Sequence, residues 1–199
     1  MRVYLEVGAK RVFACAEEWP GWSRSGRSEE AAIEELLSYA DRYAPVAPGL
    51  DLTDPVVTDR IPGDGSTDFG APGRVPPCDE GQPLPDPWLD ILVASWRLLD
   101  EVSAGAPAEL RKGPRGGGRD RDAVVQHVLN AERSYARKIG VKHREPAYDD
   151  AAAITAMRGD ILDTLRSGPS APTWPRRYFV RRTAWHVLDH AWEIQDKSA

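Results

Sequence analysis

Two histidines in the C-terminal segment RRTAWHVLDHAWEIQDK have a spacing suited to binding a metal ion. His186 and His190 are four residues apart. In a helix, four residues advance the chain by about 400°, so both imidazoles lie on one face, one turn apart. Two imidazoles at that spacing can bind the same ion, as in other helical H-x-x-x-H pairs. Trp185 and Trp192 flank the pair, which predicts an apolar environment and not a broad polar surface.

A third histidine, His127, lies in the apolar stripe of another segment that we expect to be helical, between Val124 and Ala131. Inward-facing side chains from two helices of a bundle meet in its core, so His127 can join the pair in a three-histidine site. Neutral imidazoles suit Zn²⁺, Ni²⁺ or Fe²⁺, and three protein ligands leave positions open for water or substrate. The alternative is that the spacing is coincidental and that the histidines lie on a solvated face without a ligand.

Two charged residues share the face of the histidine pair. Arg182 lies one turn before His186, and Glu193 lies three residues after His190. Because carboxylates commonly orient ligating imidazoles, we expect Glu193 to orient a ligand histidine or to approach the ion itself. A guanidinium group binds carboxylates through paired hydrogen bonds, so we expect Arg182 to bind the carboxylate of a cofactor. The spacing assigns no residue to catalysis itself.

These side chains need helices to position them, and the sequence from residue 86 onward has the period of four amphipathic helices. They begin near residues 86, 120, 147 and 176. Residues 104–119, rich in glycine and proline, interrupt the pattern between the first two. A four-helix bundle is the arrangement that buries four apolar stripes together.

The N-terminal residues have a different period. Residues 1–17 alternate between apolar and polar side chains about Gly8, which predicts a β-hairpin with one buried face. Ser28 and the acidic residues after it predict the start of a helix that ends at Pro45. Val57 and Ile61 indicate a further strand with a turn at Asp64 and Gly65. The sequence therefore predicts an α+β protein of two parts, a small ββα unit followed by a four-helix bundle.

A segment dense in proline and glycine joins the two parts. It has no apolar period, which is typical of a linker. We therefore expect three regions: the ββα unit at 1–69, the linker at 70–85 and the bundle at 86–199. Because the hydrophobic period changes at the linker, we expect the fragment from Asp86 onward to fold alone.

The composition excludes several classes of protein. The chain has 199 residues, 41% of them hydrophobic, and a net charge of -5. No apolar run approaches the roughly 20 residues that span a bilayer, and the charged N-terminus does not have the pattern of a secretory signal. Two isolated cysteines suit a reducing compartment, which predicts a cytoplasmic protein. The negative net charge argues against nucleic acid as the main ligand.

About residues 85–197 resemble the DinB-like metalloprotein superfamily. His127 on the second helix and the pair His186 and His190 on the fourth correspond to the family's metal-binding positions. The resemblance implies a divalent metal in a four-helix bundle, and an S-transferase or isomerase that uses a low-molecular-weight thiol such as mycothiol or bacillithiol. The partners would be an electrophilic small molecule and the thiol, with neither nucleic acid nor membrane, and the chain could form a homodimer. The glycine-rich stretch after the first helix has no counterpart known to us in the family.

About residues 1–45 resemble the HicB-like antitoxin domain. The resemblance consists of a strand pair, a P-G-W segment, the sequence S-R-S-G and a helix that begins with E-E-A. No DNA-binding ribbon-helix-helix or helix-turn-helix pattern follows, so the unit is expected to be structural or to bind a partner. The alternative function is therefore a non-enzymatic metal-binding protein whose HicB-like unit engages another protein.

Overall fold

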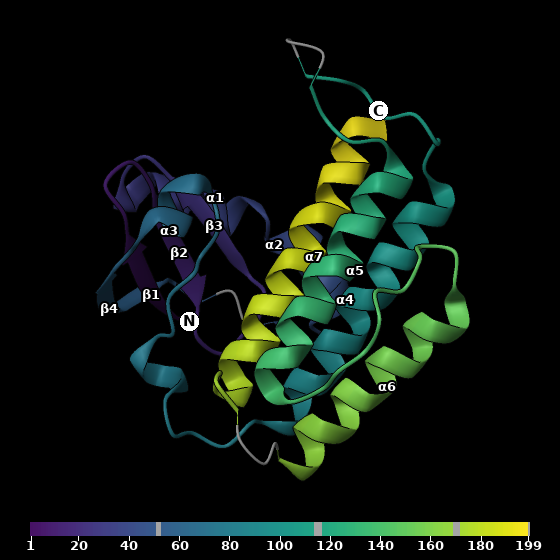
Figure 1. Cartoon of the computed structure of the whole chain (residues 1–199). Coiled ribbons are helices and arrows are strands. Elements are labelled where there is room, and N and C mark those ends of the chain that lie inside the picture. The colour runs from purple at the N-terminus through teal and green to yellow at the C-terminus, as the bar shows by residue number, and fades with distance from the viewer. Residues whose placement is uncertain (51–52, 114–116, 169–171, 199) are drawn as a thin grey trace.

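The structure is a computed structural model that describes residues 1–50, 53–113, 117–168 and 172–198. A four-stranded sheet in the N-terminal part is followed by a helical region (Figure 1), so the chain belongs to the α+β class. The strands are β1 (Arg2–Val7), β2 (Val12–Ala16), β3 (Ser23–Gly26) and β4 (Val56–Pro62). The α-helices are α1 (Glu29–Ser38), α2 (Ala40–Tyr43), α3 (Gly65–Phe69), α4 (Asp86–Gly105), α5 (Arg121–Ala136), α6 (Ala151–Ser167) and α7 (Arg176–Ser198). Short 3₁₀ helices occupy Ala44–Val46, Pro77–Asp79 and Arg137–Ile139.

The sheet has the order β3-β2-β1-β4. β1 and β2 form the expected antiparallel hairpin, and β4 lies parallel to β1 after a crossover that contains α1 and α2. The sequence does not indicate β3, because Ser-Arg-Ser-Gly has no apolar alternation. Asp64 and Gly65 do not form the expected turn but begin α3: the Asp64 side chain accepts a hydrogen bond from the Ser66 N–H and caps this helix.

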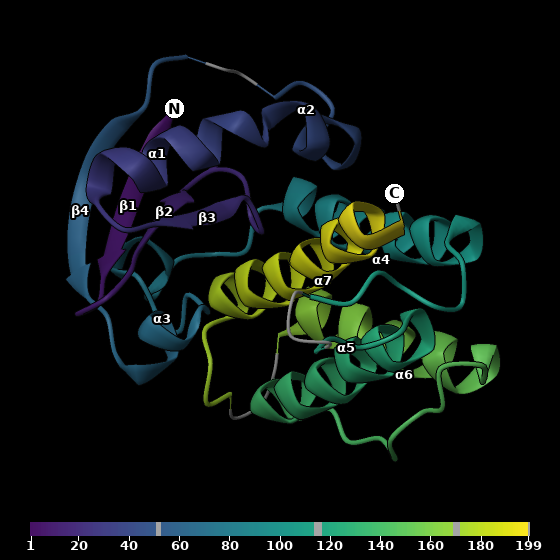
Figure 2. The same cartoon turned by 90° about the horizontal axis from the view of Figure 1, so that it is seen from above.

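Both faces of the hairpin are buried, whereas the alternating pattern predicts one buried face. All five residues of β2 are buried. Val3, Leu5 and Ala14 pack with α1 on one face, and Tyr4, Phe13 and Cys15 pack around Trp185 of α7 on the other. Figure 2 shows α1 along one side of the sheet and α7 between the sheet and α5. The expectation of one buried face is wrong because a helix from the C-terminal part buries the second face.

The helices α4 to α7 occupy the four predicted positions and surround one apolar core. α7 lies centrally and packs against both α4 and α5. Residues 114–116 of the predicted interruption, and Ala199 at the end of the predicted bundle, lie outside the described residues. In the part of the chain that the structure describes, no helix combines the length and apolarity needed to cross a membrane.

The segment 70–85 is more than a spacer between the two parts. Asp79 is fully buried, and its carboxylate accepts hydrogen bonds from Arg181 of α7 at 2.8 and 3.0 Å. The Tyr178 hydroxyl donates to the Gly73 carbonyl at 2.7 Å. The segment therefore packs along α7, because a buried ion pair and a backbone hydrogen bond attach it there.

The apolar core of the N-terminal part extends into the bundle. The same cluster that contains the sheet residue Leu5 also contains Ile91 of α4 and Leu188 and Trp192 of α7. These three side chains are almost fully buried. The fragment from Asp86 onward would therefore expose large apolar side chains, which argues against the expectation that it folds alone.

Candidate metal centre

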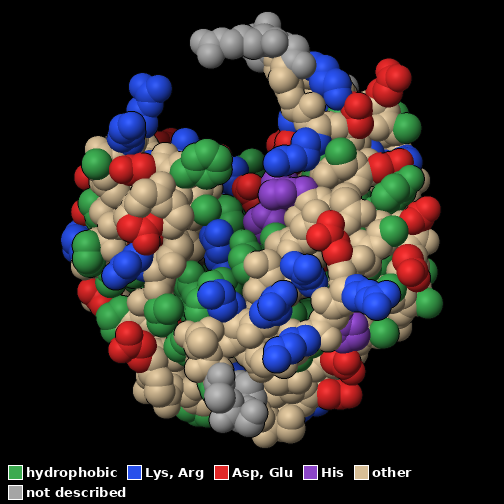
Figure 3. Space-filling view, in the orientation of Figure 1, with side chains coloured by type: hydrophobic (Ala, Val, Ile, Leu, Met, Phe, Trp, Pro, Cys, Tyr) green, Lys and Arg blue, Asp and Glu red, His purple; other side chains and the backbone are tan. Residues whose placement is uncertain are grey.

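Two adjacent helices place the three histidines together. His127 lies in the middle of α5, and His186 and His190 lie one turn apart on α7. The His127 ring centroid is 5.1 Å from that of His186 and 4.9 Å from that of His190, and the last two are 4.6 Å apart. Figure 3 shows a group of histidine side chains at the surface, beside the hollow between the two parts of the molecule. The structure thus brings together all three residues that the sequence singles out as ligands.

The potential ligand atoms are close enough for one ion. One nitrogen from each of the three rings lies within 4.8 Å of the other two. Tetrahedral binding at about 2.1 Å requires nitrogens about 3.4 Å apart, so each pair of rings would close by at most about 1.4 Å. Small side-chain rotations on fixed helices are sufficient for such a change.

His190 has a carboxylate partner that sets its tautomer. Its Nδ1 lies 2.6 Å from Glu193 Oε2, and the other oxygen of Glu193 accepts a hydrogen bond from Lys197. The pKa of Glu193 is lowered to about 2, mainly by the hydrogen bond with His190. An ionised carboxylate at Nδ1 holds a proton on that nitrogen, which leaves Nε2 as the nitrogen that can face an ion.

His186 is the most buried of the three histidines, with 7% of its surface exposed. Burial lowers its pKa well below the usual value, and the positive charges of His190 and Arg182 act in the same direction. Its Nδ1 is buried and has no hydrogen-bond partner. Leaving a buried ring nitrogen without a partner is costly. A neutral imidazole whose buried nitrogen has no hydrogen-bond partner has the properties of a metal ligand, because an ion would supply the missing partner.

His127 is only partly buried, and its pKa is also lowered, first by burial and then by the charges of His190 and Arg119. Burial and the neighbouring cationic groups therefore favour the neutral form of His127 and His186. Arg119 and the Tyr135 ring, whose centroid lies 5.9 Å from that of His186, are neighbours that sequence reasoning did not assign to the site. Tyr135 lies two helical turns after His127 in the same stripe, and this spacing could have assigned it to the site from the sequence.

Arg182 lies beside the site but is engaged in other contacts. Its Nη1 donates to the Pro72 carbonyl at 3.1 Å, and its guanidinium stacks over Trp185 at 4.7 Å and Tyr135 at 5.6 Å. The structure places it where its charge reaches His186. Its visible contacts attach residues 70–85 to α7, and the binding of a carboxylate by Arg182 stays a prediction.

The other histidine and the two cysteines lie elsewhere. His143 is in the loop before α6 and lies 2.7 Å from Asp160 Oδ2. Cys15 is buried in the sheet, and burial raises its pKa to about 12. Burial likewise raises the pKa of Cys78 to about 11. Both thiols are therefore protonated at neutral pH and poor nucleophiles.

Comparison of the chain with known proteins identifies no relative. No family model, curated protein or solved structure matches the chain. The functional argument therefore rests on the geometry and chemistry of the histidine cluster and on the sequence resemblance described above.

Proposed function

We propose that the protein binds one divalent metal ion through His127, His186 and His190. The observation that supports this most directly is the convergence of three imidazoles, one of which has a buried nitrogen without a partner. Three nitrogen donors suit Zn²⁺, Ni²⁺ or Fe²⁺ better than Mg²⁺ or Ca²⁺, which prefer oxygen. Glu193 would orient the His190 ring through the hydrogen bond at Nδ1.

We further propose that the metal centre is catalytic, as in the DinB-like thiol-dependent transferases and isomerases that the bundle resembles. An ion with three protein ligands keeps open coordination positions and, as a Lewis acid, favours thiolate over thiol. Arg119 and Arg182, whose charges act on the histidines, would attract an anionic thiol such as bacillithiol, which carries carboxylates. The expected co-substrate is a small electrophile.

A second candidate is a non-enzymatic protein whose metal is structural and whose HicB-like N-terminal unit binds another protein. One observation favours it: a substrate-sized cavity of about 530 Å³ elsewhere in the molecule is lined by no histidine. A catalytic site would be expected to have a substrate-sized cavity next to the ion.

Metal analysis of protein purified without an affinity tag tests the binding proposal. We expect about one equivalent of metal per chain. His186→Ala should reduce it to near zero, and His143→Ala, which alters the histidine outside the cluster, should not change it. Retention of full metal content by His186→Ala would contradict the proposal.

A thiol-transfer assay separates the two candidates. The metal-loaded protein is tested with mycothiol, bacillithiol and glutathione against a panel of electrophiles. If the site is catalytic, His186→Ala abolishes turnover and changes the stability of the metal-free protein little. Absence of turnover, together with a large loss of stability in His186→Ala, would favour the structural metal.

A further inference from the structure

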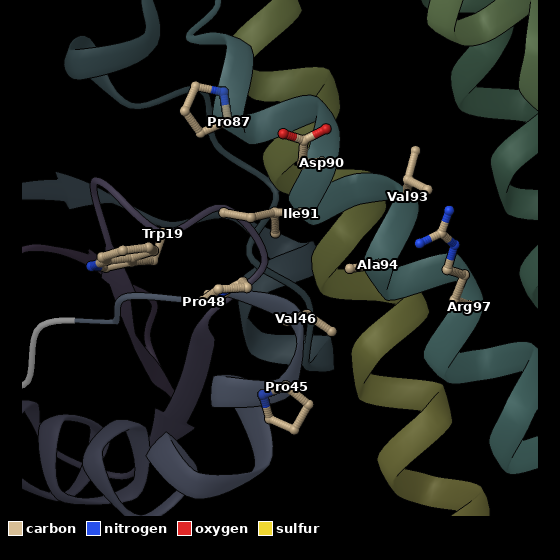
Figure 4. A pocket seen from close by; sticks show the side chains of 11 residues that line it. Trp19, Pro45, Val46, Pro48, Pro87, Asp90, Ile91, Val93, Ala94 and Arg97 are labelled. Carbon is tan, nitrogen blue, oxygen red and sulfur yellow. The ribbon is translucent and has the colours of Figure 1, made fainter.

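A cavity lies between the N-terminal part and α4 (Figure 4). Its volume is about 530 Å³, within the range of cavities that bind small molecules. Trp19, from the loop before β3, lies on one side, Val46 of the first 3₁₀ helix lies below it, and α4 forms the opposite wall. The cavity shares no residue with the histidine cluster, so the inference below does not depend on the proposed metal function.

The floor of this cavity is apolar. The buried side chains of Val46 and Ile91 line it together with Ala94 and three prolines, beside the Trp19 ring. Displacing water from apolar walls is favourable, and a tryptophan ring offers a large flat surface to an apolar group. The central part of a ligand would therefore be apolar.

Two charged residues of opposite sign, Asp90 and Arg97, also line the cavity. Asp90 and Arg97 are exposed, and among the described residues neither has a hydrogen bond or an ion pair. They are seven residues apart on one face of α4, which corresponds to about 10.5 Å along the helix axis. Ala94 lies between them, so an apolar surface separates an acidic end of the cavity from a basic one.

We infer that this cavity binds an extended zwitterion with an apolar middle, whose ammonium group pairs with Asp90 and whose carboxylate pairs with Arg97. An extended chain spans about 3.3–3.6 Å per residue, so about three residues match the rise of α4 between Asp90 and Arg97. An apolar tripeptide with free termini is the simplest compound of this class.

The test compares Leu-Ala-Leu with its N-acetylated and its C-amidated forms by isothermal titration calorimetry on the full chain. The free tripeptide is expected to bind, and blocking either terminus should weaken binding by about fivefold, the effect of a partly exposed ion pair. Equal affinity for all three forms, or no binding at millimolar concentration, overturns the proposal.

Variants assign each terminus to its partner. Arg97→Gln should make affinity insensitive to amidation and leave it sensitive to acetylation, and Asp90→Asn should do the reverse. Glu101→Gln, an exposed charge change on α4 outside the cavity, should alter neither sensitivity. These exposed side chains can be replaced without disturbing the core. An Arg97→Gln variant that still discriminates against the amide would contradict the assignment.

Discussion

The carboxylate of Glu193 connects the histidine cluster to the end of α7. It lies 2.6 Å from His190 Nδ1 and accepts a second hydrogen bond from Lys197. Its lowered pKa keeps it ionised across the physiological range. A single side chain thus fixes both the tautomer and the orientation of one proposed ligand.

Glu193→Gln should therefore weaken metal binding without removing a ligand. The amide oxygen can still accept the Nδ1–H hydrogen bond but lacks the negative charge, so Zn²⁺ affinity should fall about tenfold. Competition with a chromophoric chelator measures this change. Asp189→Asn is the matched control, because Asp189 is on the same helix but pairs with Arg24. Equal losses in both variants would indicate a general charge effect and no specific orientation by Glu193.

Asp79 and Arg181 form a buried ion pair, whose contribution to stability can be measured with a matched pair of variants. Removing one partner of a buried pair leaves an uncompensated charge, so Asp79→Asn should lower the free energy of unfolding by about 3 kcal/mol or more. Urea denaturation measures this loss. Asp163→Asn, which breaks an exposed pair with Arg166, should cost less than about 1 kcal/mol. Similar costs for both variants would show that the buried pair is not a major attachment of residues 70–85.

At the scale of elements, α7 is the helix that both parts of the molecule share. One of its faces presents His186 and His190 toward α5, another packs on α4, and Ala184 lies against the turn between β2 and β3. At that turn Gly21 has a φ of +90°, and a Cβ built on it would lie 2.8 Å from the Ala184 Cβ. Only glycine permits this approach of the turn to the helix.

Gly21→Ala should therefore destabilise the protein through two effects. A left-handed backbone costs about 1–2 kcal/mol for alanine, and the overlap with α7 adds about 1–3 kcal/mol. Gly140→Ala isolates the first effect, because Gly140 has the same φ of +90° and nothing within 4 Å of a Cβ. Thermal and urea unfolding of both variants give the difference. A Gly21→Ala cost no larger than that of Gly140→Ala would contradict close packing of the turn on α7.

At the scale of the whole molecule, the sheet and the bundle are stabilised by common apolar clusters. Trp185 packs against the sheet residues Tyr4 and Phe13, and Leu188 and Trp192 belong to the cluster around α1. The histidines and this interface therefore occupy different faces of the same helix. Rigid packing of α7 between the sheet and α4 holds the proposed ligands in place.

A fragment of residues 86–199 should consequently lose cooperative folding. Separation from the sheet exposes Trp185, Leu188 and Trp192, each worth about 1.5–3 kcal/mol when buried. Circular dichroism should show a broad melting transition, and the dye ANS, which binds exposed apolar surface, should bind the fragment but not the full chain. A sharp transition at the melting temperature of the full chain would instead establish the bundle as an independent domain.

The four helices, the first hairpin, the strand near Val57 and the three candidate ligands can be predicted from the amino-acid sequence. These features depend on local periodicity: His186 and His190 share a face because of the helical repeat, and His127 lies in an apolar stripe. The segments that cover each surface become known from the three-dimensional packing. Trp185 and Asp79 could not be placed from the sequence, because a stripe shows that a side chain is buried but not which distant segment buries it. The second buried face of the sheet, the attachment of residues 70–85 and the ring distances at the histidine cluster all follow from the position of α7.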